Sequence, residues 1–287
     1  MTTAISTIIS ILEGEILQDW GSSPLQKIWQ DHYQRANNPD DEWSADHYQL
    51  FGLEVFPFAA VYFSDIAQMG GSAVNGVLDA YKATEWDGGS QPDHLAQELK
   101  YLDHLVVSGK QDQAAQFLGE QLLPWAPIFL IALKNQHHPF FTAVAQEIED
   151  HLRGLIAKLK PQPFVANLYP VEVSFLDDED TGLKDIARML LIPASSGFYL
   201  SRADQMELAQ SIGAPAGFGT RSQILPSLFK SAVDFDKFPA LLAALQEVIS
   251  GWQDNYASRS EFGPWLTPWV ECLSQSQKIV KRLAEEV

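Results

Sequence analysis

The sequence is poor in cysteine and in positive charge. Its single Cys272 excludes an internal disulfide and any cysteine-based zinc or iron–sulfur cage, and it suits a reducing compartment. Nineteen Lys and Arg stand against 37 Asp and Glu, which gives a formal charge of −18. A negative surface potential disfavours nucleic acid and anionic membranes as partners, and it favours a cationic partner.

Long apolar runs are also missing. The longest uncharged one, Leu122 to Leu133, has 12 residues and contains two prolines, so it is too short to span a bilayer and predicts a buried helix. The N-terminal stretch MTTAISTIISILEGE lacks the basic region and cleavage site of an export signal, and its isoleucines recur at helical spacing. We therefore expect a cytoplasmic protein without stable membrane insertion.

Alternating strand patterns of useful length are absent, and helical periodicity dominates. Catalytic signatures such as Gly-x-Ser-x-Gly and the phosphate-binding Gly-x-x-x-x-Gly-Lys-Ser/Thr are absent too. The pattern predicts an all-α fold with helices near 3–19, 24–36, 43–51, 54–67, 72–85, 92–107, 111–136 with a break at its prolines, 139–159, 182–191, 202–212, 220–234, 238–257 and 264–286.

One shift in composition divides the chain. A Pro-rich stretch from Lys160 to Phe175 is followed by the acidic run Asp177 to Asp180. We interpret residues 161–181 as a linker or hinge between a larger N-terminal helical part, 1–160, and a smaller C-terminal part, 182–287. Such a hinge is compatible with a monomer or with a homodimer that exchanges helices. Beyond it, Ser201 and Asp204 have the spacing of a capping box, and Gly213 is a predicted helix end.

Five of the seven histidines directly follow an aspartate, at His32, His47, His94, His104 and His151. Neighbouring residues on a helix point about 100° apart, so an Asp-His dipeptide is not a ready-made catalytic pair. Ser90 and Asp93 have capping-box spacing, which gives Asp93 a structural explanation. On the helix that follows, His94, Glu98 and Tyr101 share one flank of the apolar stripe, whereas His104 should face solvent.

A metal site finds little support in these patterns. His94 and Glu98 supply only two ligands, whereas zinc needs three or four. His137 and His138 precede Pro139, where a solvated turn is expected. We expect neither a metal nor a cofactor. Two alternatives stay open: a helical metal-dependent hydrolase that uses His94, Glu98 and a distant third ligand, and a non-catalytic helical adaptor.

The order of several short motifs resembles the TorD/DmsD/NarJ family, the maturation chaperones of molybdenum redox enzymes. The resemblance covers roughly residues 43–160. The segments that carry it are Leu50-Phe51, Phe56-Pro57-Phe58-Ala59-Ala60-Val61-Tyr62, Val77-Leu78-Asp79-Ala80-Tyr81, Pro92-Asp93-His94-Leu95 with Glu98, and Leu123-Pro124-Trp125-Ala126-Pro127. His47 stands where the first family motif usually has an aromatic residue.

The resemblance implies a non-catalytic helical chaperone. Its partner would be the catalytic subunit of a molybdopterin oxidoreductase or that subunit's twin-arginine leader, held until the cofactor is inserted. Arginine pairs bidentately with carboxylates, and burial of the leader's apolar stretch adds affinity. The peptide-binding residues that the motifs suggest are Asp46, His47, Leu50, Phe51, Asp93, His94, Glu98 and Tyr101. Asp46 and Glu98 would pair with arginines, and Leu50, Phe51 and Tyr101 would contact the apolar stretch.

Overall fold

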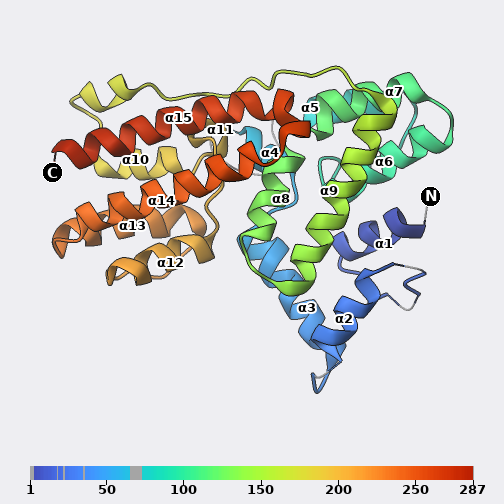
Figure 1. Cartoon of the computed structure of the whole chain (residues 1–287), viewed down its shortest axis with the longest axis horizontal. Helices are drawn as coiled ribbons and strands as arrows, with labels where there is room; N and C mark the ends of the chain where they lie inside the picture. Colours follow the sequence, from blue (N-terminus) through green and yellow to red (C-terminus); the bar gives the residue numbers. More distant parts are fainter. Residues whose placement is uncertain (1–2, 18, 22, 35, 65–72, 287) are drawn as a thin grey trace. The chain divides into compact units, whose positions relative to one another are not determined.

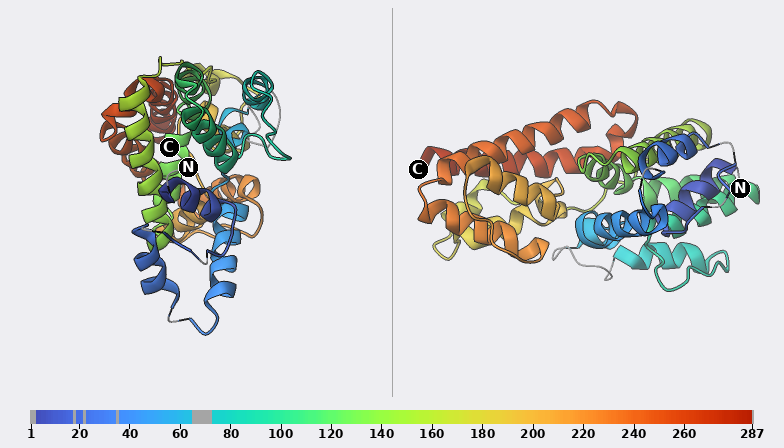
Figure 2. Two further views of the ribbon diagram at one scale, coloured as in Figure 1. Left: turned by 90° about the vertical axis from the view of Figure 1, so that its right-hand side faces the viewer. Right: turned by 90° about the horizontal axis from the view of Figure 1, so that it is seen from below.

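The computed structural model describes residues 3–17, 19–21, 23–34, 36–64 and 73–286. Within these residues the structure is helical with no strand, apart from one isolated bridge between Phe58 and His94, so the predicted all-α class is confirmed. Figure 1 and Figure 2 show the helices coloured from the N-terminus in blue to the C-terminus in red.

The chain divides into two compact units. Unit 1 comprises Met1–Val61 and Met69–Phe164, and unit 2 comprises Tyr62–Gln68 and Val165–Val287. The boundary after Phe164 falls inside the predicted linker of residues 161–181. The association of Tyr62, Phe63 and Ser64 with the C-terminal unit was not predicted. That residues 161–181 act as a hinge stays a prediction.

Unit 1 contains the elements that carry the resemblance. They are α1 (Thr3–Leu12), α2 (Leu25–Tyr33), α3 (Pro39–Gln49), η1 (Leu50–Glu54), the start of α4 (Ala59–Phe63), α5 (Ala73–Lys82), α6 (Leu95–Val107), α7 (Gln111–Phe117), η2 (Leu118–Leu122), α8 (Ala126–Lys134) and α9 (Pro139–Leu159). The apolar helix α8 is buried almost along its whole length and runs beside α9 (Figure 1), as its uncharged sequence predicts.

Unit 2 is built around two long helices, α14 (Phe238–Ala257) and α15 (Gly263–Glu286), which lie side by side in every view (Figures 1 and 2). Around them are η3 (Val173–Asp177), α10 (Leu183–Leu190), α11 (Pro193–Ser196), α12 (Arg202–Ile212), α13 (Arg221–Asp234) and η4 (Ser260–Phe262). The predicted capping box of α12 is confirmed, because Ser201 Oγ accepts from Asp204 N and Asp204 Oδ2 accepts from Ser201 N. Gly213 ends the helix with a left-handed φ of 66°.

Some predicted boundaries were wrong. The first helix ends at Leu12 instead of residue 19, because Gly14 adopts a left-handed φ of 77°, which a continuing helix does not allow. The predicted helix 54–67 begins later, at Ala59, since residues 55–57 lead into the bridge with the His94 segment. Its end at 65–67 and the predicted start of the next helix at 72 lie outside the described residues.

Among the described residues, no single helix has the length and hydropathy of a membrane-spanning segment. Only a bent pair, Gln111–Leu122 with Ala126–Lys134, passes that test jointly, and its two parts are bent by 56°.

Candidate functional site

The Pro92-Asp93-His94 segment is fixed to the segment that precedes α4. Ala59 N donates to the Asp93 carbonyl (3.0 Å), and Leu95 N donates to the Pro57 carbonyl (2.9 Å). The Asp93 side chain also takes part, because its Oδ2 accepts from Ala60 N at 3.1 Å in the first turn of α4. Asp93 is buried, and burial raises the pKa of its carboxyl. Asp93 therefore caps α4, across 33 residues of sequence.

The capping box predicted for Ser90 and Asp93 was wrong. The helix that follows begins at Leu95, and its N-cap is His94, whose Nδ1 accepts from Ala96 N at 3.1 Å. The His94 ring also packs edge-on against Phe58, with centroids 4.9 Å apart. Burial lowers the pKa of His94 to about 4, so the ring is neutral at neutral pH and can accept the capping bond.

Glu98 lies one turn further along α6 and has no solvent exposure. Its Oε2 accepts from the indole N–H of Trp125 at 3.3 Å, and its Oε1 has no hydrogen-bond partner among the described residues. Burial raises the pKa of Glu98 well above its usual value, and the nearby Asp93 adds to the shift. The fold therefore favours the protonated carboxyl, and in this conformation the buried group is not accessible to a peptide.

Tyr101 connects α6 to α5. Its hydroxyl donates to the Ala80 carbonyl (2.8 Å) and accepts from Thr84 Oγ1 (3.0 Å). Tyr81 on α5 lies against it, with ring centroids 4.7 Å apart, and donates its own hydroxyl to the Pro92 carbonyl at 2.9 Å. The segment Val77 to Tyr81, which contributes to the resemblance, is thus held directly against the Pro-Asp-His segment.

The second group of predicted residues lies at the junction of α3 and η1. His47 donates from Nε2 to the Leu12 carbonyl at 3.3 Å and so satisfies an end carbonyl of α1. Burial lowers the pKa of His47, in keeping with a neutral ring that donates. Leu50 and Phe51 are buried, and Phe51 packs against Phe129 and against other aromatic rings of the core.

The two groups meet in one interior. Phe51 stacks on Phe129 with centroids 6.3 Å apart, Phe129 lies 6.0 Å from Trp125, and Trp125 reaches Glu98. The electrostatic interaction with the nearby His47 is also among the causes that lower the pKa of His94, after burial. The structure therefore brings together the segments that carry the resemblance, but mostly as core. Of the eight predicted residues, only Asp46 and His47 are partly exposed.

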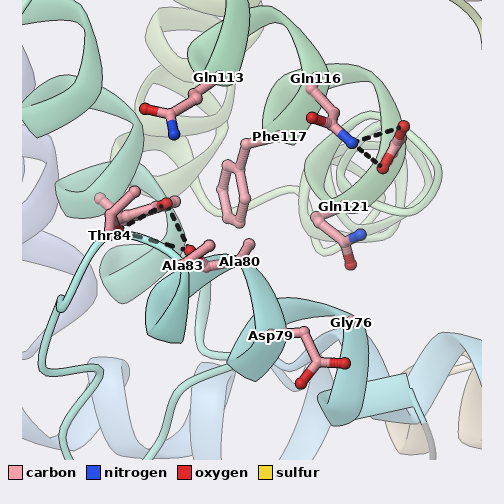
Figure 3. Close-up of a pocket in the computed structure, with 11 residues that line it drawn as sticks. Gly76, Asp79, Ala80, Ala83, Thr84, Gln113, Gln116, Phe117 and Gln121 are labelled. Carbon is pink, nitrogen blue, oxygen red and sulfur yellow. Dashed lines mark hydrogen bonds between the residues drawn. The ribbon is translucent and has the colours of Figure 1, made fainter. Parts of the chain in front are cut away.

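Next to this core, unit 1 contains a cavity of about 370 Å³ between α5 and the helices α7 and η2. Tyr101 and Phe117, both buried, form its apolar floor. The Phe117 ring projects into the space between Ala80 and Ala83 on one side and Gln113 on the other (Figure 3). The charged side chains in its lining are both acidic, Asp79 and Glu120. An apolar floor with acidic walls suits a side chain that combines methylenes with a positive charge.

The sequence missed one cluster altogether. Asp46 Oδ2 lies 3.1 Å from His138 Nε2 and 3.9 Å from His32 Nε2, and it accepts from Tyr33 OH at 3.1 Å. His138, predicted to lie in a solvated turn, is instead the N-cap of α9. Burial is the largest cause of its lowered pKa. Positions 32, 46 and 138 match no ligand spacing, so only the fold reveals this group.

His104 is partly covered and lies against Trp86, with centroids 4.8 Å apart, so the expectation that it faces solvent was wrong. His94 and Glu98 do not form a metal centre with any third ligand among the described residues. Trp125 has no solvent exposure, which confirms that it belongs to the core.

These features define an all-helical protein in which short motifs from five segments converge on one buried core next to an acidic-walled cavity. Residues 21–130 match the family model "Nitrate reductase delta subunit". This match, over a little more than a third of the chain, confirms the resemblance to the TorD/DmsD/NarJ family of molybdoenzyme maturation chaperones. No curated protein and no solved structure gives a significant match.

Proposed function

We propose that the protein is a non-catalytic cytoplasmic chaperone that binds the precursor of a molybdopterin oxidoreductase and holds it until its cofactor is inserted. The observation that carries the proposal is the family match over residues 21–130, which contains all five motif segments in full. The contacts from Asp93 to Ala60, from Tyr81 to Pro92 and from Trp125 to Glu98 explain why these motifs occur together.

We divide the eight predicted residues into three groups according to the part each plays in this function. Asp93, His94, Glu98 and Tyr101 are buried and hydrogen-bonded, and they hold α4, α5 and α6 in place. Leu50 and Phe51 anchor η1 in the aromatic core. Asp46 and His47 reach the surface, but each already has hydrogen-bond partners within unit 1. Direct contact with a client then falls to neighbouring surface residues.

The cavity between α5 and η2 is the contact site that the chemistry favours. A basic segment of the client, such as an arginine of a twin-arginine leader, would place its methylenes on Tyr101 and Phe117. Its guanidinium group would meet Asp79 and Glu120. Neither carboxylate forms a strong ion pair within the protein. The pair of Lys82 with Asp79, at 3.4 Å, is exposed to solvent, and the partner of Glu120 is the neutral side chain of Gln116. The net charge of −18 would speed encounter with such a segment.

The hydrolase alternative has no support in the arrangement of His94 and Glu98. Glu98 is buried and accepts a hydrogen bond from Trp125, and the His94 nitrogen Nδ1 accepts the capping N–H of Ala96. A purely structural adaptor remains the rival proposal. It predicts no preference for basic peptides and no effect of carboxylates in the cavity.

The test is a titration of the client's basic leader peptide against the full chain at two salt concentrations. We expect Asp79→Asn and Glu120→Gln to weaken binding about 5- to 30-fold each, because a bound guanidinium group would partly desolvate these carboxylates, and such charge pairs contribute roughly 1–2 kcal/mol. Asp112→Asn is the matched control, since Asp112 is an exposed acid on α7 outside the cavity lining. Equal losses of affinity in all three variants would show that the carboxylates act only by long-range attraction. If the wild type did not bind the peptide at all, the adaptor proposal would be favoured.

A further inference from the structure

We propose that His32, Asp46 and His138 form a binding site for a divalent transition-metal cation of the zinc type. The three residues come from the last turn of α2, from α3 and from the N-cap position of α9, all within unit 1. Among the described residues, this is the group of at least three potential ligands that lies close enough to share one ion.

The distances are near those that a tetrahedral ion requires. Zinc bonds of about 2.0–2.1 Å at tetrahedral angles separate ligand atoms by roughly 3.4 Å. Asp46 Oδ2 is 3.1 Å from His138 Nε2 and 3.9 Å from His32 Nε2, and one ligand atom from each of the three residues lies within 4.8 Å of the others. Closing the wider gaps takes shifts of about an ångström. His32 and His138 stand at helix ends, where side-chain rotation leaves the helix intact.

The chemistry of the group also fits. Two imidazoles and one carboxylate are the ligand set of zinc sites that keep a fourth position open. The side chains of His32, Asp46 and His138 are 31%, 29% and 19% exposed, so an ion can enter from solvent yet is partly shielded. Tyr33 OH donates to the carboxylate at 3.1 Å and so fixes its orientation, as outer-shell partners of metal ligands do.

Metal binding replaces two existing hydrogen bonds of His138. His138 Nδ1 accepts from Phe141 N across 3.4 Å, which leaves the ring proton on Nε2, where it is donated to Asp46. Coordination through Nε2 requires this proton to move to Nδ1, and the long bond from Phe141 is then lost. The Phe141 amide therefore reports on occupancy of the site without any assay of function.

The experiment uses the full chain without an affinity tag, freed of metal by chelation, and titrates it calorimetrically with zinc chloride and, separately, with magnesium chloride. We expect one equivalent of zinc to bind and magnesium to bind weakly, because imidazole ligands select the former. His32→Gln, Asp46→Asn and His138→Asn should each weaken zinc binding at least tenfold. Asn at position 138 preserves an N-cap, so this variant should fold.

The control is His137→Asn, a neighbouring exposed histidine in the left-handed conformation that asparagine tolerates. It should bind zinc like the wild type, and zinc should shift the Phe141 amide resonance in both proteins. The proposal is overturned if the wild type shows no saturable zinc binding. It is equally overturned if His32→Gln binds zinc as tightly as the control. This variant should fold, because His32 is partly exposed and its Nε2 lies 3.9 Å from Asp46 Oδ2.

Discussion

Trp125 donates its indole N–H to Oε2 of Glu98 over 3.3 Å, in an interior where neither side chain is exposed to solvent. This contact ties the Leu-Pro-Trp segment to the helix of the Pro-Asp-His segment, which are 27 residues apart in sequence. Burial raises the pKa of Glu98 well above its usual value, so the fold favours the protonated carboxyl, which avoids the cost of a buried charge.

Glu98→Gln should therefore be tolerated, with a cost below about 2 kcal/mol at pH 5. The raised pKa means that the folded wild type keeps the Glu98 proton to a higher pH than the unfolded chain does, so this group makes the wild type less stable as the pH rises. The glutamine of the variant cannot ionise, so this fall in stability is absent. The unfolding free energy of the variant relative to the wild type should therefore increase from pH 5 to pH 9. Urea unfolding of both proteins across this range measures it. A relative stability that does not change with pH would show that Glu98 is ionised in the fold.

His94 gives the opposite pH dependence. Its folded pKa of about 4 lies below the unfolded value near 6.5, so protonation favours unfolding, and stability falls as the pH drops from about 6.5 to about 4. The loss amounts to roughly 3 kcal/mol at most. His94→Asn keeps a side chain that caps α6 and removes the titration, so its unfolding free energy should depend less on pH in this window. If the unfolding free energies of the two proteins fell equally between about pH 6.5 and about pH 4, His94 would be excluded as the cause.

Asp93 is expected to stabilise the start of α4, and not the start of α6 that its sequence position suggests. Asp93→Ala removes the acceptor for Ala60 N at the start of α4 and should cost about 1–3 kcal/mol, because a buried N–H loses its partner. Asp93→Asn retains an acceptor and should cost less. Ser90→Ala is the control, since Ser90 is exposed and α6 is capped by His94 instead. If Ser90→Ala destabilised the protein as much as Asp93→Ala, the result would support the capping box of Ser90 and Asp93 and contradict the role of Asp93 at α4.

Gly14 leaves room for the ring of the predicted site residue His47, which bonds the Leu12 carbonyl. A Cβ at position 14 would lie 2.9 Å from Cε1 of His47, and the backbone there has a φ of 77°. Gly14→Ala should destabilise the protein by about 1–2 kcal/mol. Gly154→Ala is the matched control, because that glycine lies within α9 with no atom near its absent Cβ. There the exchange should stabilise by about 0.5–1 kcal/mol. Thermal or urea unfolding of the two variants decides.

Local patterns made the fold predictable. The box of Ser201 and Asp204 is complete within four residues, and the helix they start was predicted to the residue at its C-terminal end. The resemblance selected segments that do meet in one core. What the sequence could not give are the partners of these segments, since Asp93 bonds a residue 33 positions away and Asp46 meets His138 across 92 positions. The exposure of each site residue depends on those contacts, and so burial of Glu98 and Tyr101 was not foreseen.

The central claim is that the protein holds a molybdoenzyme precursor, and capture of bound proteins from the native cell tests it most directly. The full chain is immobilised, and the retained proteins are identified by mass spectrometry, with Asp79→Asn/Glu120→Gln as the comparison bait. We predict that the catalytic subunit of a molybdopterin oxidoreductase dominates the material bound to the wild type and is depleted on the double variant. Retention of unrelated proteins in equal amounts on both baits would contradict the account.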